Sequence, residues 1–152
     1  MASREAGYTL IEMVAVLAIV AMLAGIALPH WPSGTTRPRL EAYALSIAAI
    51  LKADRTAALS RRARVATLLD VKTRAVSSGA GAGVVRLPED VTFDAVVAQT
   101  CAGGQNGSEI DFLPSGMSCG GLIALARPGA AYRVRVNWLT GGVEVVAADP
   151  PR

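Results

Sequence analysis

The sequence is poor in the side chains from which catalytic and metal sites are usually built. It has a single histidine, His30, and two cysteines, Cys101 and Cys119. A hydrolase needs a nucleophile beside a base, but His30 lies next to the most apolar segment of the chain. Two cysteines and one histidine do not complete a four-ligand zinc site. We therefore expect no catalytic residues, no metal and no cofactor.

Charged residues are also sparse, at 18% of the chain with a formal net charge of +3. The arginines are interleaved with acids, and no tract has the clustered Lys and Arg of a nucleic-acid-binding surface. The stretch from Ala147 to Arg152 has one acid and one base. The composition therefore predicts no nucleic-acid partner.

Two glycine-rich tracts, Ser77 to Gly83 and Cys101 to Ser108, lack the Gly-Lys-Ser/Thr ending of a phosphate-binding loop. We interpret both as flexible polar loops. The acids could in principle supply the carboxylate pair of an exported enzyme, but nothing in their spacing favours catalysis. We expect these acids to face solvent on strands and turns: Glu89, Asp90, Asp94, Glu109 and Asp111.

A long apolar run near the start of the chain is the most distinctive feature. Met13 to Leu28 contains no charged side chain. As a helix, Tyr8 to Leu28 would be roughly 31 Å long, which matches the hydrocarbon core of a membrane. One carboxylate, Glu12, lies near the beginning of this run, where an isolated acid is unfavourable.

Three interpretations of this run remain open on composition. It could be a secretory signal cleaved near Gly25-Ile26-Ala27, a plain transmembrane anchor, or an anchor from which Met1 to Gly7 are removed. In the third case the new amine of Tyr8 lies one helical turn from Glu12, and the two charges compensate each other in the apolar layer. The pair can form within one chain or between neighbouring chains, and only the second arrangement makes Glu12 an assembly determinant.

The segment after the apolar run predicts a break followed by a second helix. Prolines and glycine between Pro29 and Pro38 disfavour helix and predict a loop over 29–38. From Arg39 to Arg64 apolar residues recur three and four positions apart, which predicts an amphipathic helix packed on a sheet. We expect its charged residues on other faces: Glu41, Lys52, Asp54, Arg55 and Arg62.

Beyond Arg64 the apolar period changes to two, which indicates strands. The clearest alternation runs from Tyr132 to Trp138, and Gly141-Gly142 predict a hairpin turn after it. A helix followed only by strands predicts an α+β fold with antiparallel sheets. The predicted strands are Val65–Val71, Gly83–Leu87, Val91–Val97, Glu109–Leu113, Leu122–Ala126, Ala131–Leu139 and Val143–Ala147.

The segment Gly7-Tyr8-Thr9-Leu10-Ile11-Glu12, followed by the apolar run to Pro29, resembles the class III signal of type IV pilins and type II secretion pseudopilins. In that family a prepilin peptidase cuts after the glycine and methylates the new N-terminal residue, and the glutamate guides subunit docking. The resemblance implies cleavage between Gly7 and Tyr8, methylation of Tyr8 and a docking role for Glu12. The family usually has Phe or Met where this chain has Tyr8, and a basic residue where it has Ala6.

A second stretch, Ile110 to Leu125, resembles the F-x-P-x-G-x-S-x-G-G region of the pseudopilin H (GspH) and FimT group. Its matching residues are Phe112, Pro114, Gly116, Ser118, Gly120 and Gly121. The resemblance implies a pilin-like fold with a leader over 1–7, a transmembrane and assembly helix over 8–28, and a periplasmic globular domain over 39–152.

The same resemblance implies a minor pseudopilin of the type II secretion system. Such a subunit is anchored in the bacterial inner membrane by one span, lies near the tip of the periplasmic pseudopilus, and supports protein export across the outer membrane. The implied partners are the major and other minor pseudopilins, the prepilin peptidase, the inner-membrane secretion platform and membrane lipid. The alternative is a FimT-like minor type IV pilin involved in pilus assembly, adhesion or DNA uptake.

Export of the globular part bears on the two cysteines. In an oxidising compartment Cys101 and Cys119 are expected to form a disulfide, which would contribute about 3 kcal/mol by restricting the unfolded chain. The alternative is that they are two unrelated thiols.

Overall fold

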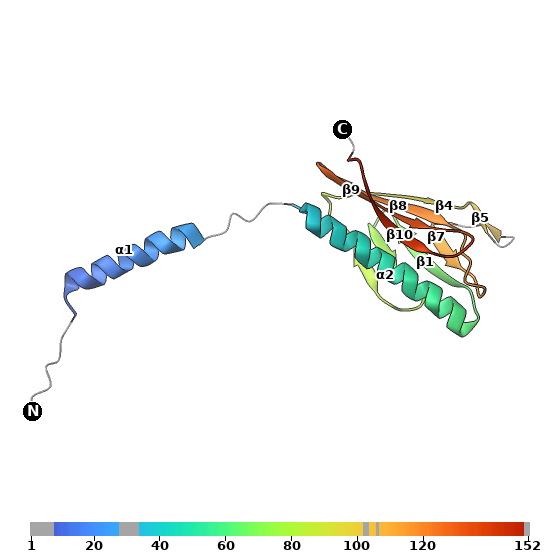
Figure 1. The fold of residues 1–152 in the computed structure, drawn as a ribbon, viewed down its shortest axis with the longest axis horizontal. Coiled ribbons are helices and arrows are strands. Elements are labelled where there is room, and N and C mark those ends of the chain that lie inside the picture. The colour runs from blue at the N-terminus through green and yellow to red at the C-terminus, as the bar shows by residue number, and fades with distance from the viewer. Residues whose placement is uncertain (1–7, 28–33, 102–103, 106, 151–152) are drawn as a thin grey trace, which may run out of the picture. The chain divides into compact units, whose positions relative to one another are not determined.

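The computed structural model describes residues 8–27, 34–101, 104–105 and 107–150. It divides into two compact units, one ending at Ser33 and the other beginning at Gly34. The first contains helix α1, Leu10–Ala27. The second contains helix α2, Arg37–Arg61, followed by β-strands (Figure 1). The predicted order of elements, helix, helix and then strands, is confirmed.

Helix α1 begins with a side-chain cap and exposes its apolar residues. The Glu12 amide lies 3.4 Å from Thr9 Oγ1 and 3.1 Å from the Thr9 carbonyl oxygen. Thr9 and Glu12 have the spacing of a capping box. All side chains from residue 10 to residue 24 are exposed, including Leu10 at 84% and Met22 at 74%. No helix in the described ranges meets both the length and the hydropathy required of a membrane span.

Helix α2 begins two residues before the predicted Arg39 and ends three before Arg64. Pro38 is accommodated in its first turn, where a missing amide hydrogen costs no helical bond. Arg62 adopts a left-handed conformation with φ 50°, and the Ala63 amide donates to the Ala58 carbonyl at 3.3 Å, which closes the helix. The buried face includes Leu40, Ala44, Ile47, Leu51 and Ala58, as the periodicity predicted.

The strands that the structure describes form three antiparallel sheets. Sheet A has the order β3-β2-β1-β7, sheet B the order β10-β9-β8-β4, and β5 pairs with β6. Helix α2 lies along the sheets and contacts β1 of sheet A and β9 and β10 of sheet B (Figure 1). The strands are β1 Val65–Asp70, β2 Ala75–Ser77, β3 Val84–Arg86, β4 Thr92–Val97, β5 Thr100–Cys101, β6 Gly104–Gln105, β7 Glu109–Phe112, β8 Gly121–Arg127, β9 Ala130–Val136 and β10 Val143–Ala148.

The central strand β9 shows how the alternating pattern produces the core. Its Val134 and Val136 face inward and its Arg133 and Arg135 face outward. It ends at Val136, three residues earlier than predicted, because Asn137 Oδ1 accepts the amides of Leu139 and Thr140 and turns the chain. The largest buried side chains around it come from α2 and both sheets: Leu40, Ile47, Leu51, Ile110, Phe112, Ile123 and Leu125.

Candidate functional site

The structure describes Tyr8 and Glu12 at the start of α1. Tyr8 is 79% exposed, and Glu12 is exposed in the first helical turn, where a negative charge interacts favourably with the helix dipole. Gly7, the predicted residue before the cleaved bond, lies outside the described residues. Because the rest of α1 is aliphatic on all sides, this unit offers an apolar surface with one carboxylate near its beginning.

The motif from Phe112 to Gly121 forms a strand, a tight turn and a second strand, as predicted. The Leu113 amide donates to the Met117 carbonyl at 2.9 Å, and the Gly116 amide donates to the Leu113 carbonyl at 2.9 Å. Gly116 has φ +85°, which favours glycine at this position. Phe112 is fully buried in the core.

Arg55 of α2 fastens this turn to the turn between β9 and β10. Its Nε donates to the Gly116 carbonyl at 3.2 Å and to the Thr140 carbonyl at 3.1 Å. The two turns approach so closely that a Cβ at Gly141 would lie 2.2 Å from the Gly116 carbonyl oxygen. The motif therefore forms a structural junction between α2 and two turns.

Cys101 and Cys119 are joined by a disulfide, with their Cα atoms 5.6 Å apart. The bond connects β5 to the segment between β7 and β8. The Cys119 Sγ lies 3.8 Å from Asp111 Oδ2. The side chains of Cys101, Asp111 and Cys119 place their possible ligand atoms within 4.8 Å of one another. Because both sulfurs form the disulfide, they are not available as the thiolates that a metal would require.

Asp111 corrects the prediction that the acids of the strands face solvent. Its side chain is 0% exposed, and Arg64 lies beside it, with Arg64 Nη2 2.6 Å from Asp111 Oδ2 and 3.0 Å from Glu109 Oε1. The hydrogen bond from Arg64 to Asp111, followed by the charge of Asp111, raises the pKa of the guanidinium. Arg64 itself was predicted to end the helix, but it follows α2 and balances the buried carboxylate.

Asp54 is a second buried carboxylate, although it was predicted on an exposed face of the helix. It is 0% exposed and accepts four hydrogen bonds that connect α2 to β1 and to the tract after β2. The donors are Thr67 Oγ1 at 2.6 Å, Ser78 Oγ at 2.5 Å, the Gly79 amide at 3.2 Å and the Ala80 amide at 3.0 Å. The glycine-rich tract from Ser77 to Gly83 therefore folds around the fixed Asp54 carboxylate, which corrects the interpretation of this tract as a flexible loop.

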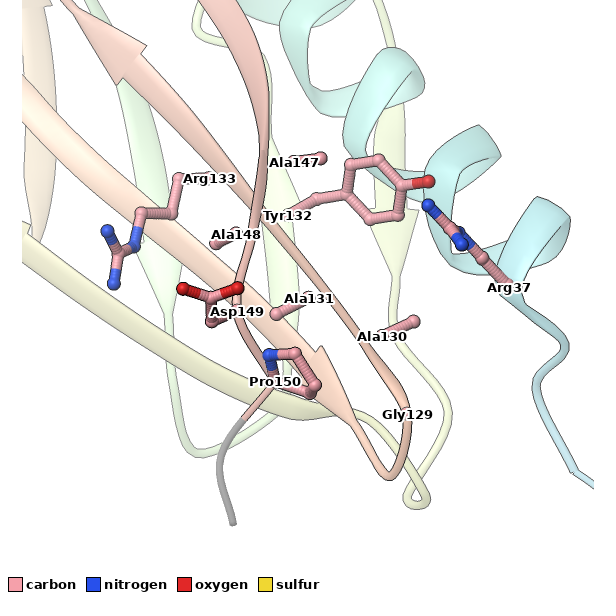
Figure 2. A pocket seen from close by; sticks show the side chains of 10 residues that line it. All are labelled: Arg37, Gly129, Ala130, Ala131, Tyr132, Arg133, Ala147, Ala148, Asp149 and Pro150. Atoms are coloured by element: carbon pink, nitrogen blue, oxygen red, sulfur yellow. The ribbon is translucent and has the colours of Figure 1, made fainter.

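A surface cavity of about 480 Å³ lies near the start of α2, between Arg37 and the end of β10 (Figure 2). Figure 2 shows Arg37 on one side, Arg133 on the other, and Asp149 beside the end of β10. Asp149 is the only acid among the lining residues. This cavity does not supply the two converging carboxylates that a glycoside hydrolase would use.

The comparisons with known proteins identify the family. Residues 2–28 match the model of the prokaryotic N-terminal methylation motif. The chain is 31% identical over 138 residues to the type II secretion system protein H of Xanthomonas campestris pv. campestris, covering 90% of this chain and 80% of that protein. The chain belongs to the type II secretion system protein H family. The resemblance found in the sequence is thereby confirmed.

Solved structures place this member of the protein H family among the pilin-like folds. The minor pseudopilin EpsH of Vibrio cholerae matches with a TM-score of 0.57 and 15% identity, covering 76% of this chain and 99% of that one. The type IV minor pilin FimU of Pseudomonas aeruginosa matches with a TM-score of 0.52 and 16% identity, covering 75% of this chain and 96% of that one. At these identities the likeness concerns the fold alone, and it confirms the α+β prediction.

Proposed function

We propose that this protein H family member is a minor pseudopilin, a structural subunit near the tip of the periplasmic pseudopilus that supports protein export across the outer membrane. The observation that carries the proposal is the 31% identity to a type II secretion system protein H over 90% of the chain. It acts by assembly and catalyses no reaction. Its partners are the major and other minor pseudopilins and the inner-membrane secretion platform.

The apolar surface of α1 supports a role as anchor and assembly helix. Its aliphatic side chains are exposed, with Leu10 at 84%, Leu17 at 67% and Leu23 at 61%. Membrane lipid and the corresponding helices of other pseudopilins would cover them after assembly. In this proposal residues 8–28 span the inner membrane, and the globular unit that begins at Gly34 forms the periplasmic head.

Processing by a prepilin peptidase prepares this helix. The match of residues 2–28 to the N-terminal methylation motif supports cleavage between Gly7 and Tyr8 and methylation of the Tyr8 amine. The leader, residues 1–7, is then absent from the mature subunit. An isolated carboxylate in the hydrocarbon costs about 2–3 kcal/mol, and the Tyr8 amine of a neighbouring subunit compensates the charge of Glu12. The charge of Glu12 thus favours the arrangement in which the subunit is docked against its neighbour over the undocked one.

The test replaces Glu12 with Gln in the full-length protein, expressed in a strain that lacks its own copy. Asp94→Gln is the matched control, because Asp94 is an exposed acid on β4 of the head. Loss of about 2 kcal/mol of compensation corresponds to roughly a thirtyfold weaker docking equilibrium. We expect Glu12→Gln to fold normally but to lower both the amount recovered in sheared pseudopili and exoprotein export by at least about tenfold. Incorporation equal to that of the control would contradict the charge-pair mechanism.

The FimT-like minor pilin remains the second candidate, and the fold likeness to FimU, with a TM-score of 0.52, supports it. The two functions differ in what deletion of the gene abolishes. Loss of exoprotein export with normal surface piliation supports the pseudopilin. Loss of piliation or DNA uptake with normal export supports the pilin.

A further inference from the structure

The chain enters the globular unit at Gly34 and Thr35, where Thr35 is held from two sides. Asp90 Oδ2 accepts the Thr35 amide at 2.5 Å, and Asp90 Oδ1 accepts the Thr35 hydroxyl at 3.0 Å. Arg127 Nη1 donates to the Thr35 carbonyl at 2.5 Å. Every polar group of Thr35 therefore has a partner far away in the sequence.

The two partners lie at one end of the paired strands β4 and β8 of sheet B. Asp90 precedes β4, and Arg127 is the last residue of β8, which pairs with β4. Thr35 is only 5% exposed. Gly34 has φ +114°, and a Cβ there would lie 3.2 Å from Asp90 Oδ2, so the backbone passes close to the carboxylate. The Thr35 amide is the main cause of the lowered pKa of Asp90, and the charge of Arg127 adds to it.

These contacts are separate from the formation of α2. The helix begins at Arg37, and its first hydrogen bond runs from the Leu40 amide to the Thr36 carbonyl at 2.9 Å. Asp90 itself is exposed and is not part of the hydrophobic core. Loss of the contacts to Thr35 would therefore release the residues before the helix without removing core packing.

We propose that Asp90 and Arg127 form a clamp on Thr35 that fixes the point at which the chain from α1 joins the head, and thereby limits the length of the tether between them during assembly. This inference rests on the proposed function, because a tether matters only if α1 is held in a membrane or a fibre. It assigns to Asp90 and Arg127 a positioning role that core stability does not explain.

The effect of the clamp on the tether follows from chain geometry. From Ala27 to Gly34 there are about seven Cα–Cα steps, which reach at most about 24 Å. With the clamp open, the tether extends to Arg37 over about ten steps and reaches about 35 Å. For a module joined by a flexible linker, the effective concentration at its docking site falls with roughly the −3/2 power of linker length. Lengthening the tether from seven to ten steps therefore lowers the effective concentration of the head by about 1.7-fold. Opening the clamp also frees the direction in which the chain leaves the head, which lowers the effective concentration further.

The test compares Asp90→Ala with Glu89→Ala in the full-length protein. Glu89 is an exposed carboxylate at the adjacent position, which makes it a matched control. Hydrogen exchange of the Thr35 amide, measured in detergent micelles, reports the clamp, and the thermal midpoint reports the head fold. Pseudopilus incorporation in a deletion strain reports the function.

We expect Asp90→Ala to accelerate exchange at Thr35 at least about tenfold, consistent with loss of roughly 1.4 kcal/mol of protection. Its thermal midpoint should match that of Glu89→Ala, and its incorporation should fall by about twofold or more. Arg127→Met, which removes the bond to the Thr35 carbonyl and the positive charge near Asp90, should act in the same direction. It keeps the inference testable if Asp90→Ala does not fold.

Three results would overturn the inference. Thr35 protection that survives both substitutions would show that the clamp does not hold this residue. Rapid exchange with unchanged incorporation would show that the clamp has no role in assembly. Failure of the wild-type protein to enter pseudopili would instead overturn the proposed function, and the inference with it.

Discussion

The buried carboxylate of Asp54 gives the sharpest prediction about the head. Each of its oxygens accepts one hydroxyl and one backbone amide: Oδ2 accepts from Thr67 and Gly79, and Oδ1 accepts from Ser78 and Ala80. The substitution Asp54→Asn keeps the shape but replaces one oxygen with an NH₂ group. The Thr67 hydroxyl can rotate to accept from that group, whereas Ser78 Oγ already accepts the Ala80 and Ala82 amides, and a backbone amide can only donate. Either orientation of Asn therefore leaves one amide facing a donor.

The expected cost follows from these contacts. One backbone amide that faces a donor in place of its carboxylate acceptor costs about 1–3 kcal/mol, and the remaining bonds lose the strength that a charged acceptor gives them. Removing the cost of burying a charge offsets part of this loss. We expect Asp54→Asn to lower the free energy of unfolding by about 2–4 kcal/mol. For a head of this size, the thermal midpoint should fall by about 10 °C.

The assay is urea and thermal unfolding of the full-length protein in detergent micelles, followed by circular dichroism. Asp94→Asn, which changes an exposed acid on β4, is the matched control. Thr67→Val, alone and combined with Asp54→Asn, isolates the bond between these two side chains as a coupling energy. An Asp54→Asn midpoint equal to that of the Asp94→Asn control would refute the view that this network holds α2 to β1.

The remaining predictions concern the cross-link, the clamp and the leader. Replacing both Cys101 and Cys119 with Ser removes a cross-link with a sequence separation of 18, and should lower the free energy of unfolding by about 3 kcal/mol; a urea midpoint equal to that of the oxidised wild type would contradict this. The Thr35 amide lowers the pKa of Asp90, so the clamp's contribution is present above the ordinary pKa of 3.8 and is lost as the pH falls through the lowered value. Thr35 exchange, corrected for its intrinsic rate, should show this transition in the wild type, and the same transition in Asp90→Asn would exclude Asp90 as its cause. Gly7→Val should block leader removal, and recovery of methylated Tyr8 from that variant would show that the assigned bond is wrong.

The periodic parts of the fold could be predicted from the sequence because their patterns are regular over many residues. The buried positions of α2 recur through the whole helix, and β9 alternates between buried and exposed residues. Strands β2, β5 and β6 have only two or three residues, which is too short for a period to appear. They form through pairing with β1, with β3 and with each other.

The buried acids could not be predicted because their partners are distant in sequence. Asp54 has the spacing of a residue at the edge of the apolar face, but its donors Thr67 and Ser78 lie 13 and 24 positions away. Asp111 is held by Arg64, 47 positions away. The N-terminal motif was recognisable because its residues are consecutive and its chemistry depends on local spacing. The Thr35 clamp, in contrast, brings together residues from three separated segments.

The most direct test of the assignment is the intact mass of the protein extracted from membranes of a strain that has the prepilin peptidase. We expect a chain that begins at Tyr8 and carries one added methyl group on its N-terminal amine. A chain that retains Met1, or one that begins at Leu28 after loss of the whole apolar helix, would contradict the assignment.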